Sequence, residues 1–395
     1  MNYFKKDNIL TINLPDSDLV FTRYLYIKDE VYIALLVSIL NKSDDAIFWA
    51  YELYHSGYKH KFFELIWLIY YDFFATLNPS FESYLFKKHR EWILTNGESD
   101  PTQDKIVSIL VQNLLIRPFN TDIFILRNIC NSFIIDIEYH DTVNINDLQD
   151  LKTNFEKWLE EDDFRSIAQW ILNVNQNKIN IFEIYQLILN IFDNKLTKKI
   201  EKDFLNMITK IPIDVNIILL SKIISFISKQ KKLVKGKSFY INVEPEDVVQ
   251  YETINNIKHY RILENACIYG IDDFKYLSLF KLKRHKYKKT LKTKYWHNWE
   301  YHASFSPIWF ERIRSCNGYV DFSNKKVIFE DPDLFYSLYG YEPDEQKLHI
   351  QEKSIGEIES KNTWQTFYKK YKKNGIIELY DEEIEEFDVD KILYL

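Results

Sequence analysis

One stretch decides the fold of this chain: residues 46–74, AIFWAYELYHSGYKHKFFELIWLIYYDFF. It contains two apolar, aromatic-rich segments separated by a polar turn that includes Gly57. A glycine after an apolar segment and an acid before it, here Asp44, are typical signals for the end and the start of a helix. The stretch therefore predicts an antiparallel pair of helices, near 44–56 and 60–77.

Helical signals continue on both sides of this pair, near 28–42 and 81–95. The layout also returns at 166–193, as an aromatic-bearing segment, a polar turn and a segment that opens with Phe-Glu-aliphatic. Two hairpins of this kind suit an irregular helical-repeat domain, although unrelated amphipathic hairpins share the same layout.

Glycine, proline and charge divide the chain into regions. Neither glycine nor proline occurs between Pro118 and Pro212, which favours helices joined by short polar turns. Five of the eight glycines lie from Gly270 onward, so the last third should contain more turns. The segment SFYINV at 238–243 is strand-like, and alternating apolar residues flank the turn signal PDSD at 15–18. The sequence predicts a mainly α protein with an N-terminal β-hairpin (1–27), an irregular helical-hairpin domain (28–230), a mixed α/β domain (238–377) and an acidic tail (378–395).

Composition restricts the function classes. With 51 Lys and Arg against 58 Asp and Glu, the formal net charge is −7, so any polyanion-binding surface must be local. The three cysteines are far apart, which argues for a reducing compartment and against a zinc ribbon or disulfide framework. The most apolar run, 62–77, is interrupted by Glu64 and Asp72 and is too short to span a bilayer. We expect no signal peptide and no membrane partner.

A basic stretch followed by aromatic residues is the candidate contact surface. Residues 281–305, KLKRHKYKKTLKTKYWHNWEYHASF, begin with fourteen residues that include eight Lys or Arg and no acid. As a helix, 281–294 would be about 21 Å long, with a narrow apolar seam and a broad cationic surface. Lysines there would bind phosphate, and the following tryptophans would stack on bases. The candidate nucleic-acid-binding residues are Lys281, Lys283, Arg284, Lys286, Lys288, Lys289, Lys292, Lys294, Trp296 and Trp299.

Two other interpretations of the basic stretch stay open. A lysine-rich helix is often only a solvated surface. Alternatively, it docks within the molecule on the tail at 378–390, ELYDEEIEEFDVD, which has eight acids and no base. A second basic–aromatic cluster at 364–373, WQTFYKKYKK, could extend the cationic surface.

The evidence for catalysis is weak. VKGKS at 234–238 lacks the first glycine and the strand-to-helix context of a phosphate-binding loop. His297, Glu300 and His302 could form a metal site with Cys316, but the two histidines fall on different faces of a helix or a strand. We therefore favour packed histidines and predict no catalytic residue, metal or cofactor. An enzyme with a metal site here remains an alternative.

Several segments resemble an uncharacterised protein family of giant viruses, the nucleocytoplasmic large DNA viruses. They are YRILENACIYGIDDFKYLSLFKLKR (260–284), WEYHASFSPIWFERI (299–313) and GYEPDEQ (340–346), and AIFWAYELYHSGY (46–58) is similar to the same family. The resemblance implies no particular activity for this chain. It implies a viral protein that acts in the host cytoplasm, in a viral factory, or in the virion.

Our functional hypothesis is a non-catalytic adaptor or scaffold. The helical domain would bind another viral or host protein, and residues 281–301 would contact RNA or DNA phosphates. The alternative is a virion or assembly protein whose basic helix is docked on its acidic tail. The pattern does not distinguish RNA from DNA and does not define the oligomeric state.

Overall fold

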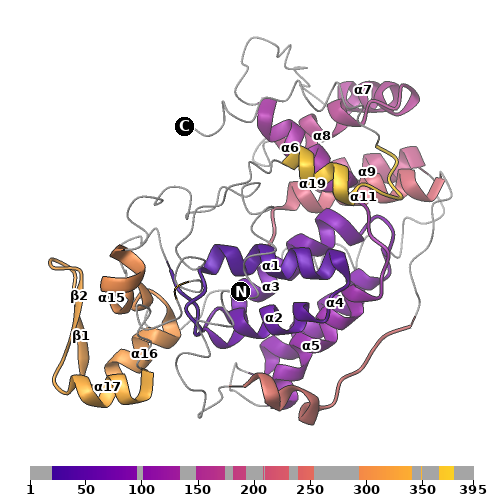
Figure 1. Cartoon of the computed structure of the whole chain (residues 1–395). Coiled ribbons are helices and arrows are strands. Elements are labelled where there is room, and N and C mark those ends of the chain that lie inside the picture. Colours follow the sequence, from indigo (N-terminus) through magenta and orange to yellow (C-terminus); the bar gives the residue numbers. More distant parts are fainter. Residues whose placement is uncertain are drawn as a thin grey trace.

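The computed structural model of the chain is mainly helical, as the sequence predicts, and its described part has one small antiparallel β-hairpin (Figure 1). Two hydrophobic cores form, a large one in the helical part and a small one beside the hairpin. The structure describes residues 20–95, 101–133, 148–173, 181–192, 208, 210–230, 239–252, 293–339, 348 and 364–377.

The first four predicted helices are present close to their predicted bounds. They are α1 (Lys28–Asn41), α2 (Asp45–His55), α3 (Lys59–Ile69) with the π-helical turn η1 (Tyr70–Phe74), and α4 (Phe81–Leu94). The helix pair predicted from residues 46–74 is thus confirmed as α2 and α3, which lie against each other.

The two ends of α2 compare differently with the sequence signals. Gly57 ends the helix as predicted, since its φ of 89° is left-handed and its N–H donates to the Tyr54 carbonyl. The capping role predicted for Asp44 is wrong, because Asp44 has helical backbone angles and its side chain caps nothing. Instead, the Ser43 hydroxyl accepts the Asp45 N–H at 3.3 Å. A hydroxyl one residue earlier thus satisfies a free donor at the helix start.

The helical part continues through six further helices in the described residues. In one of them, α9 (Ile181–Phe192), the polar residues Glu183, Gln186 and Asn190 recur every three or four positions and are exposed, while the residues between them are largely buried. The other five helices are α5 (Pro101–Leu115), α6 (Asp122–Phe133), α7 (Leu148–Glu160), α8 (Phe164–Asn173) and α11 (Val215–Gln230).

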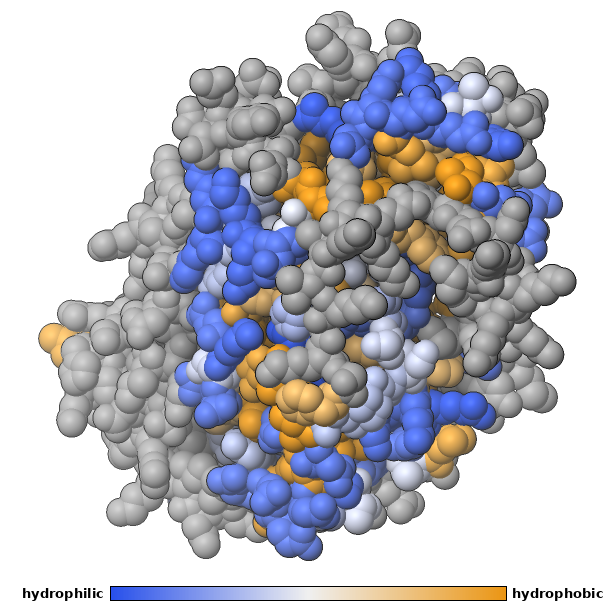
Figure 2. Space-filling model, turned by 90° about the vertical axis from the view of Figure 1, so that its right-hand side faces the viewer, coloured by the Kyte–Doolittle hydropathy of each residue, from blue (hydrophilic) through white to orange (hydrophobic). Residues whose placement is uncertain are grey.

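On the face in Figure 2, hydrophilic residues cover much of the described surface and apolar residues appear between them.

Large aromatic side chains fill the first core, including the buried Trp49 and Trp67. Several of their polar atoms are satisfied inside it. Trp92 Nε1 donates to the Tyr54 hydroxyl at 2.8 Å, and this hydroxyl donates to Asp104 Oδ1 at 2.8 Å. Such bonds let Trp and Tyr fill a core without leaving unpaired donors.

The strand predicted at 238–243 is wrong as a sheet element. Residues 239–243 form no regular element and pair with no strand of the described chain. Asn113 takes the place of a neighbouring strand: its Nδ2 donates to the Ile241 carbonyl at 2.8 Å, and its Oδ1 accepts the Ile241 N–H at 3.0 Å. The segment therefore binds to α5 and leads into the 3-10 helix η3 (Pro245–Tyr251).

A mixed α/β unit follows at 293–339, within the range predicted for one. The hairpin register places Gly318 opposite Phe329 and Asp321 opposite Lys326. One face of the hairpin packs on the second core, where the Phe329 and Phe335 rings are stacked at 4.1 Å. The elements are η5 (Thr293–His297), α15 (Trp299–Ala303), α16 (Pro307–Ser315), β1 (Gly318–Asp321), β2 (Lys326–Phe329) and α17 (Pro332–Tyr339).

The predicted N-terminal hairpin is only partly within the described residues, since its turn at 15–18 lies outside them. Its expected second strand is interrupted. The N–H of Leu25 donates to the Thr22 carbonyl, Leu25 has a φ of 60°, and Phe21 and Ile27 form an isolated bridge across this turn. Alternation does not produce a strand here because Leu25 and Ile27 join the second core while Tyr26 joins the first.

Helix α19 (Trp364–Tyr371) packs on the helical part, although it lies within the range 238–377. The segment after it is held by Asp122, whose carboxylate accepts the N–H groups of Ile376 (3.1 Å) and Ile377 (3.3 Å). A Cβ on Gly375 would lie 2.4 Å from Asp122 Oδ1, so this close approach requires glycine. The domain boundaries drawn from the sequence remain predictions, and contacts cross them.

Gly57→Ala should destabilise the fold by roughly 2–4 kcal/mol, because it combines a strained positive φ with overpacking. The new Cβ would lie 2.5 Å from Pro307 Cβ at the start of α16. Urea unfolding measures the change. The control is Lys42→Gly at the exposed end of α1, where φ is 58° and glycine relieves strain. This control should be neutral or slightly stabilising. Equal stability of Gly57→Ala and wild type would contradict the close packing of α2 on α16.

Candidate interaction surface

Most of the candidate nucleic-acid-binding residues lie outside the described residues, and so does the acidic tail at 378–390. Lys294 and Trp296 are half-buried in η5, and Trp299 begins α15. Those outside are Lys281, Lys283, Arg284, Lys286, Lys288, Lys289 and Lys292.

The base-stacking role predicted for Trp299 is wrong in this structure. Its side chain is 3% exposed, and its ring lies edge-on to Trp309 at 5.4 Å and stacked with Phe335 at 6.1 Å. A base cannot stack on a ring whose faces are covered by the core. The aromatic run after the lysines therefore supplies the second core.

His302 is a buried residue on which two basic residues from separate elements act. It is 6% exposed, and burial lowers its pKa to about 4, with further lowering by the positive charges of Lys294 and Lys325. Lys294 precedes α15, whereas Lys325 belongs to the turn between β1 and β2. The fold thus brings the end of the basic stretch beside the turn of the hairpin.

The hairpin turn is built to hold its exposed residues in place. The Asp321 carboxylate accepts the N–H groups of Ser323 and Asn324, both at 3.0 Å, and the Asn324 side-chain amide at 2.7 Å. These bonds lower the pKa of Asp321. Lys325 closes the turn with a φ of 52°. The result is a defined turn whose first residue, Phe322, remains 44% exposed.

Phe322 adds an accessible aromatic ring to this place. It lies edge-on to Tyr301 and Phe305, each at 6.4 Å, and these two rings are themselves in contact. We call the set Lys294, Tyr301, Phe305, Phe322 and Lys325 the basic–aromatic corner. The sequence pattern at 281–301 missed Phe322 and Lys325, because FSNKK alone indicates only a turn. The signal that could have identified these two residues is their position in the turn of a β-hairpin, between β1 and β2.

The proposed metal ligands are not brought together. His297 is exposed, the Glu300 carboxylate accepts the Tyr336 hydroxyl at 2.8 Å, and Cys316 is buried in the second core. The ring of His302 lies edge-on to Phe21 and Tyr301. Across the residues that the structure describes, no group of three or more His, Cys, Asp or Glu is placed to hold a metal ion.

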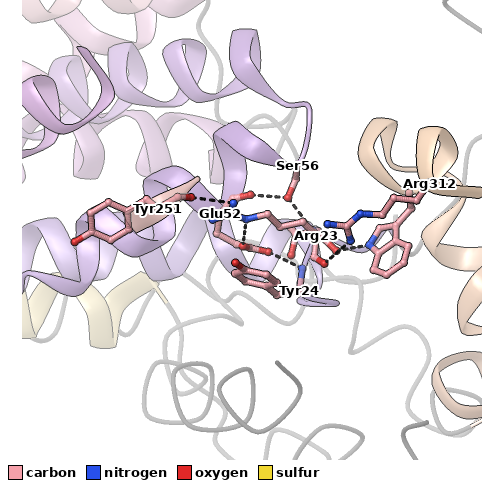
Figure 3. A network of polar contacts seen from close by, with 8 residues as sticks. Arg23, Tyr24, Glu52, Ser56, Tyr251 and Arg312 are labelled. Carbon is pink, nitrogen blue, oxygen red and sulfur yellow. Dashed lines mark hydrogen bonds and ion pairs between the residues drawn. The ribbon is translucent and has the colours of Figure 1, made fainter. Parts of the chain in front are cut away.

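A buried polar network positions the mixed unit on the helical part (Figure 3). Arg23 lies at its centre. Its Nε donates to Glu52 Oε2 of α2 at 2.9 Å, and its Nη1 donates to the Tyr251 carbonyl at the end of η3 at 3.0 Å. The backbone joins in, since the Arg23 N–H donates to Ser56 Oγ and the Tyr24 N–H donates to Glu52 Oε1. We call Arg23, Tyr24, Glu52, Ser56 and Tyr251 the clasp.

Helix α16 binds the other side of the same turn. Trp309 Nε1 donates to the Thr22 carbonyl at 2.8 Å, and Arg312 Nη1 donates to the Arg23 carbonyl at 3.2 Å. The Arg312 guanidinium lies over the rings of Trp309 (4.5 Å) and Tyr339 (5.0 Å). One short turn at residues 22–24 thus connects α2, η3 and α16 through its backbone and the Arg23 side chain.

Comparisons with protein-family models, curated proteins and solved structures found nothing that matches this chain. In the part of the chain that the structure describes, no helix has the length and apolar character needed to cross a bilayer.

His302 should make stability depend on pH. The folded state keeps it neutral with a pKa of about 4 against an ordinary value of 6.5, so the unfolded state binds more protons between these values. Stability therefore falls as pH decreases from 6.5 to 4. His302→Gln should reduce this slope by about 1 kcal/mol per pH unit. Urea unfolding at several pH values measures it, with the exposed His297→Gln as control. Equal slopes for wild type and His302→Gln would contradict the burial.

Breaking the clasp should lower the free energy of unfolding. Glu52→Gln leaves the buried Arg23 guanidinium without its counter-charge, and we expect a loss of about 3 kcal/mol in the free energy of unfolding. The matched control is Glu64→Gln, which breaks the exposed pair with Lys61 and should cost less than about 1 kcal/mol. Similar effects of the two substitutions would contradict a central role for the clasp.

Proposed function

We propose that this chain is a non-catalytic adaptor whose mixed α/β unit contacts the phosphates of RNA or DNA. The observation that carries the proposal is the basic–aromatic corner, where Lys294 and Lys325 lie near one buried histidine beside the exposed ring of Phe322. Lysines supply sequence-independent attraction to phosphates, and an exposed ring supplies a stacking platform.

The charge of the corner favours a polyanion over a neutral ligand. Both lysines contribute positive potential at His302. Basic residues at 281–292 lead directly into Lys294. In a chain of net charge −7, such a local cationic site would select where a nucleic acid binds.

Phe322 takes over the stacking role first expected of Trp299. A single-stranded nucleic acid can place a base on an exposed ring, whereas a duplex keeps its bases stacked inside. We therefore propose a preference for single strands, with Phe322 as the stacking residue and Lys294 and Lys325 as phosphate contacts.

For the helical part we propose binding to a viral or host protein, because packed helical hairpins form extended surfaces of the kind that repeat proteins use for partners. The resemblance of 260–284 and 299–313 to a giant-virus family supports a viral origin. We accordingly propose the host cytoplasm or the virion as its location.

Fluorescence anisotropy with labelled single- and double-stranded RNA and DNA tests the corner. Each phosphate contact contributes about one unit to the slope of log affinity against log salt, so Lys294→Glu with Lys325→Glu should reduce the slope by about two. Phe322→Ala should weaken single-strand binding by about 5- to 100-fold and leave duplex binding nearly unchanged. The control is Lys61→Glu with Lys87→Glu on exposed helical positions.

Two results would contradict the proposal. Binding that does not depend on salt would exclude phosphate contacts. No binding at low salt, together with lower stability after deletion of 378–395, would favour the alternative in which the basic stretch docks on the acidic tail. Stoichiometric metal in the purified protein would instead favour an enzyme.

A further inference from the structure

The outer face of the hairpin has a regular charge pattern. Along β2 and the residue after it, side chains alternate between exposed and half-buried, so Lys326, Ile328 and Glu330 point outward. Val327 and Phe329 point inward and pack against the second core. Ile328 is 39% exposed, and its cross-strand partner Tyr319 is 59% exposed. The outward row is therefore basic, apolar and acidic in turn.

The outer edge of β2 is not paired with any strand of the described chain. β2 pairs only with β1 there, and none of the described residues forms a hydrogen bond to the other edge of β2. Lys326 and Glu330 form no ion pair with any described residue. An open strand edge is a template for pairing with another strand, and natural proteins often protect it with a lysine. Here the same row also carries Glu330, whose negative charge can offset the positive charge of a lysine on an added strand.

We propose that β2 is a self-association edge, where two copies of the chain pair antiparallel to form a four-stranded sheet. The pairing is centred on Ile328, which would face Ile328 of the second copy. Because the row is Lys326, Ile328, Glu330, an antiparallel partner places a glutamate opposite each lysine. The occupant of this edge is thus a second copy of the chain, chosen by charge complementarity. This inference goes beyond the nucleic-acid contact, since none of these residues belongs to the basic–aromatic corner.

The same charges select one arrangement among the possible ones. A parallel pairing would place Lys326 opposite Lys326 and Glu330 opposite Glu330, and like charges directly opposite each other are destabilising. A register shift of two residues would place a lysine opposite an isoleucine and lose both ion pairs. Only the antiparallel register centred on Ile328 forms both pairs and keeps two-fold symmetry, which is the usual symmetry of homodimers.

The interface should be weak. Strands of four residues bury much less than the roughly 1,200 Å² that stable complexes bury, so we expect a dissociation constant of roughly 1–100 μM. Sedimentation velocity over a wide concentration range measures it, without nucleic acid present.

Charge exchange tests the register. Lys326→Glu alone and Glu330→Lys alone should each be monomeric, with dimerisation at least ten-fold weaker than in wild type. The double variant K326E/E330K restores both pairs and should dimerise like wild type. A mixture of the two single variants should form a heterodimer, because every glutamate then faces a lysine. Glu330 is exposed, so Glu330→Lys should leave thermal unfolding unchanged, whereas Lys326→Glu lies opposite Asp321 and should lower it slightly.

Disulfide trapping tests the centre of symmetry. Residues opposite each other in antiparallel strands have Cα atoms about 4.5–5.5 Å apart, within the range for a disulfide. Ile328→Cys should therefore oxidise to a covalent dimer. The control Tyr319→Cys lies one strand further from the axis and should not. Wild type that stays monomeric at several hundred micromolar, or a double variant that stays monomeric, or equal trapping of both cysteines, would overturn the proposal.

Discussion

The buried ion pair between Arg23 and Glu52 is the interaction on which the arrangement of the molecule depends. Removing two charges from water is expensive, and the structure offsets that cost by surrounding the pair with further hydrogen bonds. Glu52 accepts from the Arg23 side chain and from the Tyr24 N–H, while the Arg23 carbonyl accepts from Arg312. A hydrophobic contact could join two units with some freedom of angle, whereas this network fixes the angle. The place of the corner and of the hairpin relative to the helices follows from it.

The turn that carries Arg23 also lies between the two cores. Leu25 and Ile27 pack into the second core and Tyr26 into the first, so neighbouring side chains point into different units. Leu25 reaches its position through a left-handed backbone that a bulky residue adopts only when its surroundings require it. Packing on both sides therefore fixes the backbone conformation of this turn, and the clasp and the two cores stabilise one another.

The helices could be predicted because their sequence signals are local. The features that were predicted wrongly depend on contacts between residues far apart in the sequence. Helices α1 to α4 follow from apolar periodicity and from Gly57, which act within a few residues. The segment at Ile241 has the composition of a strand, but its hydrogen-bond partner is the side chain of Asn113. Trp299 looked like a stacking residue because it follows lysines, and only the position of Trp309 shows that it is core. In the corner, Lys294 was predicted, while Phe322 and Lys325 depend on a hairpin that folds back from the next segment.

The hydrogen bond from Trp309 to the Thr22 carbonyl joins residues 287 positions apart in the chain. A ribosome that adds about 5–20 residues per second needs on the order of 15–60 s to cover that distance. Throughout this time Phe21, Leu25 and Ile27 have been synthesised, but the core that they complete has not. The growing chain thus carries this short apolar segment without its partners until the residues around Trp309 emerge. Such a segment is what holdase chaperones bind, and it can fold only after partners that are made much later in synthesis.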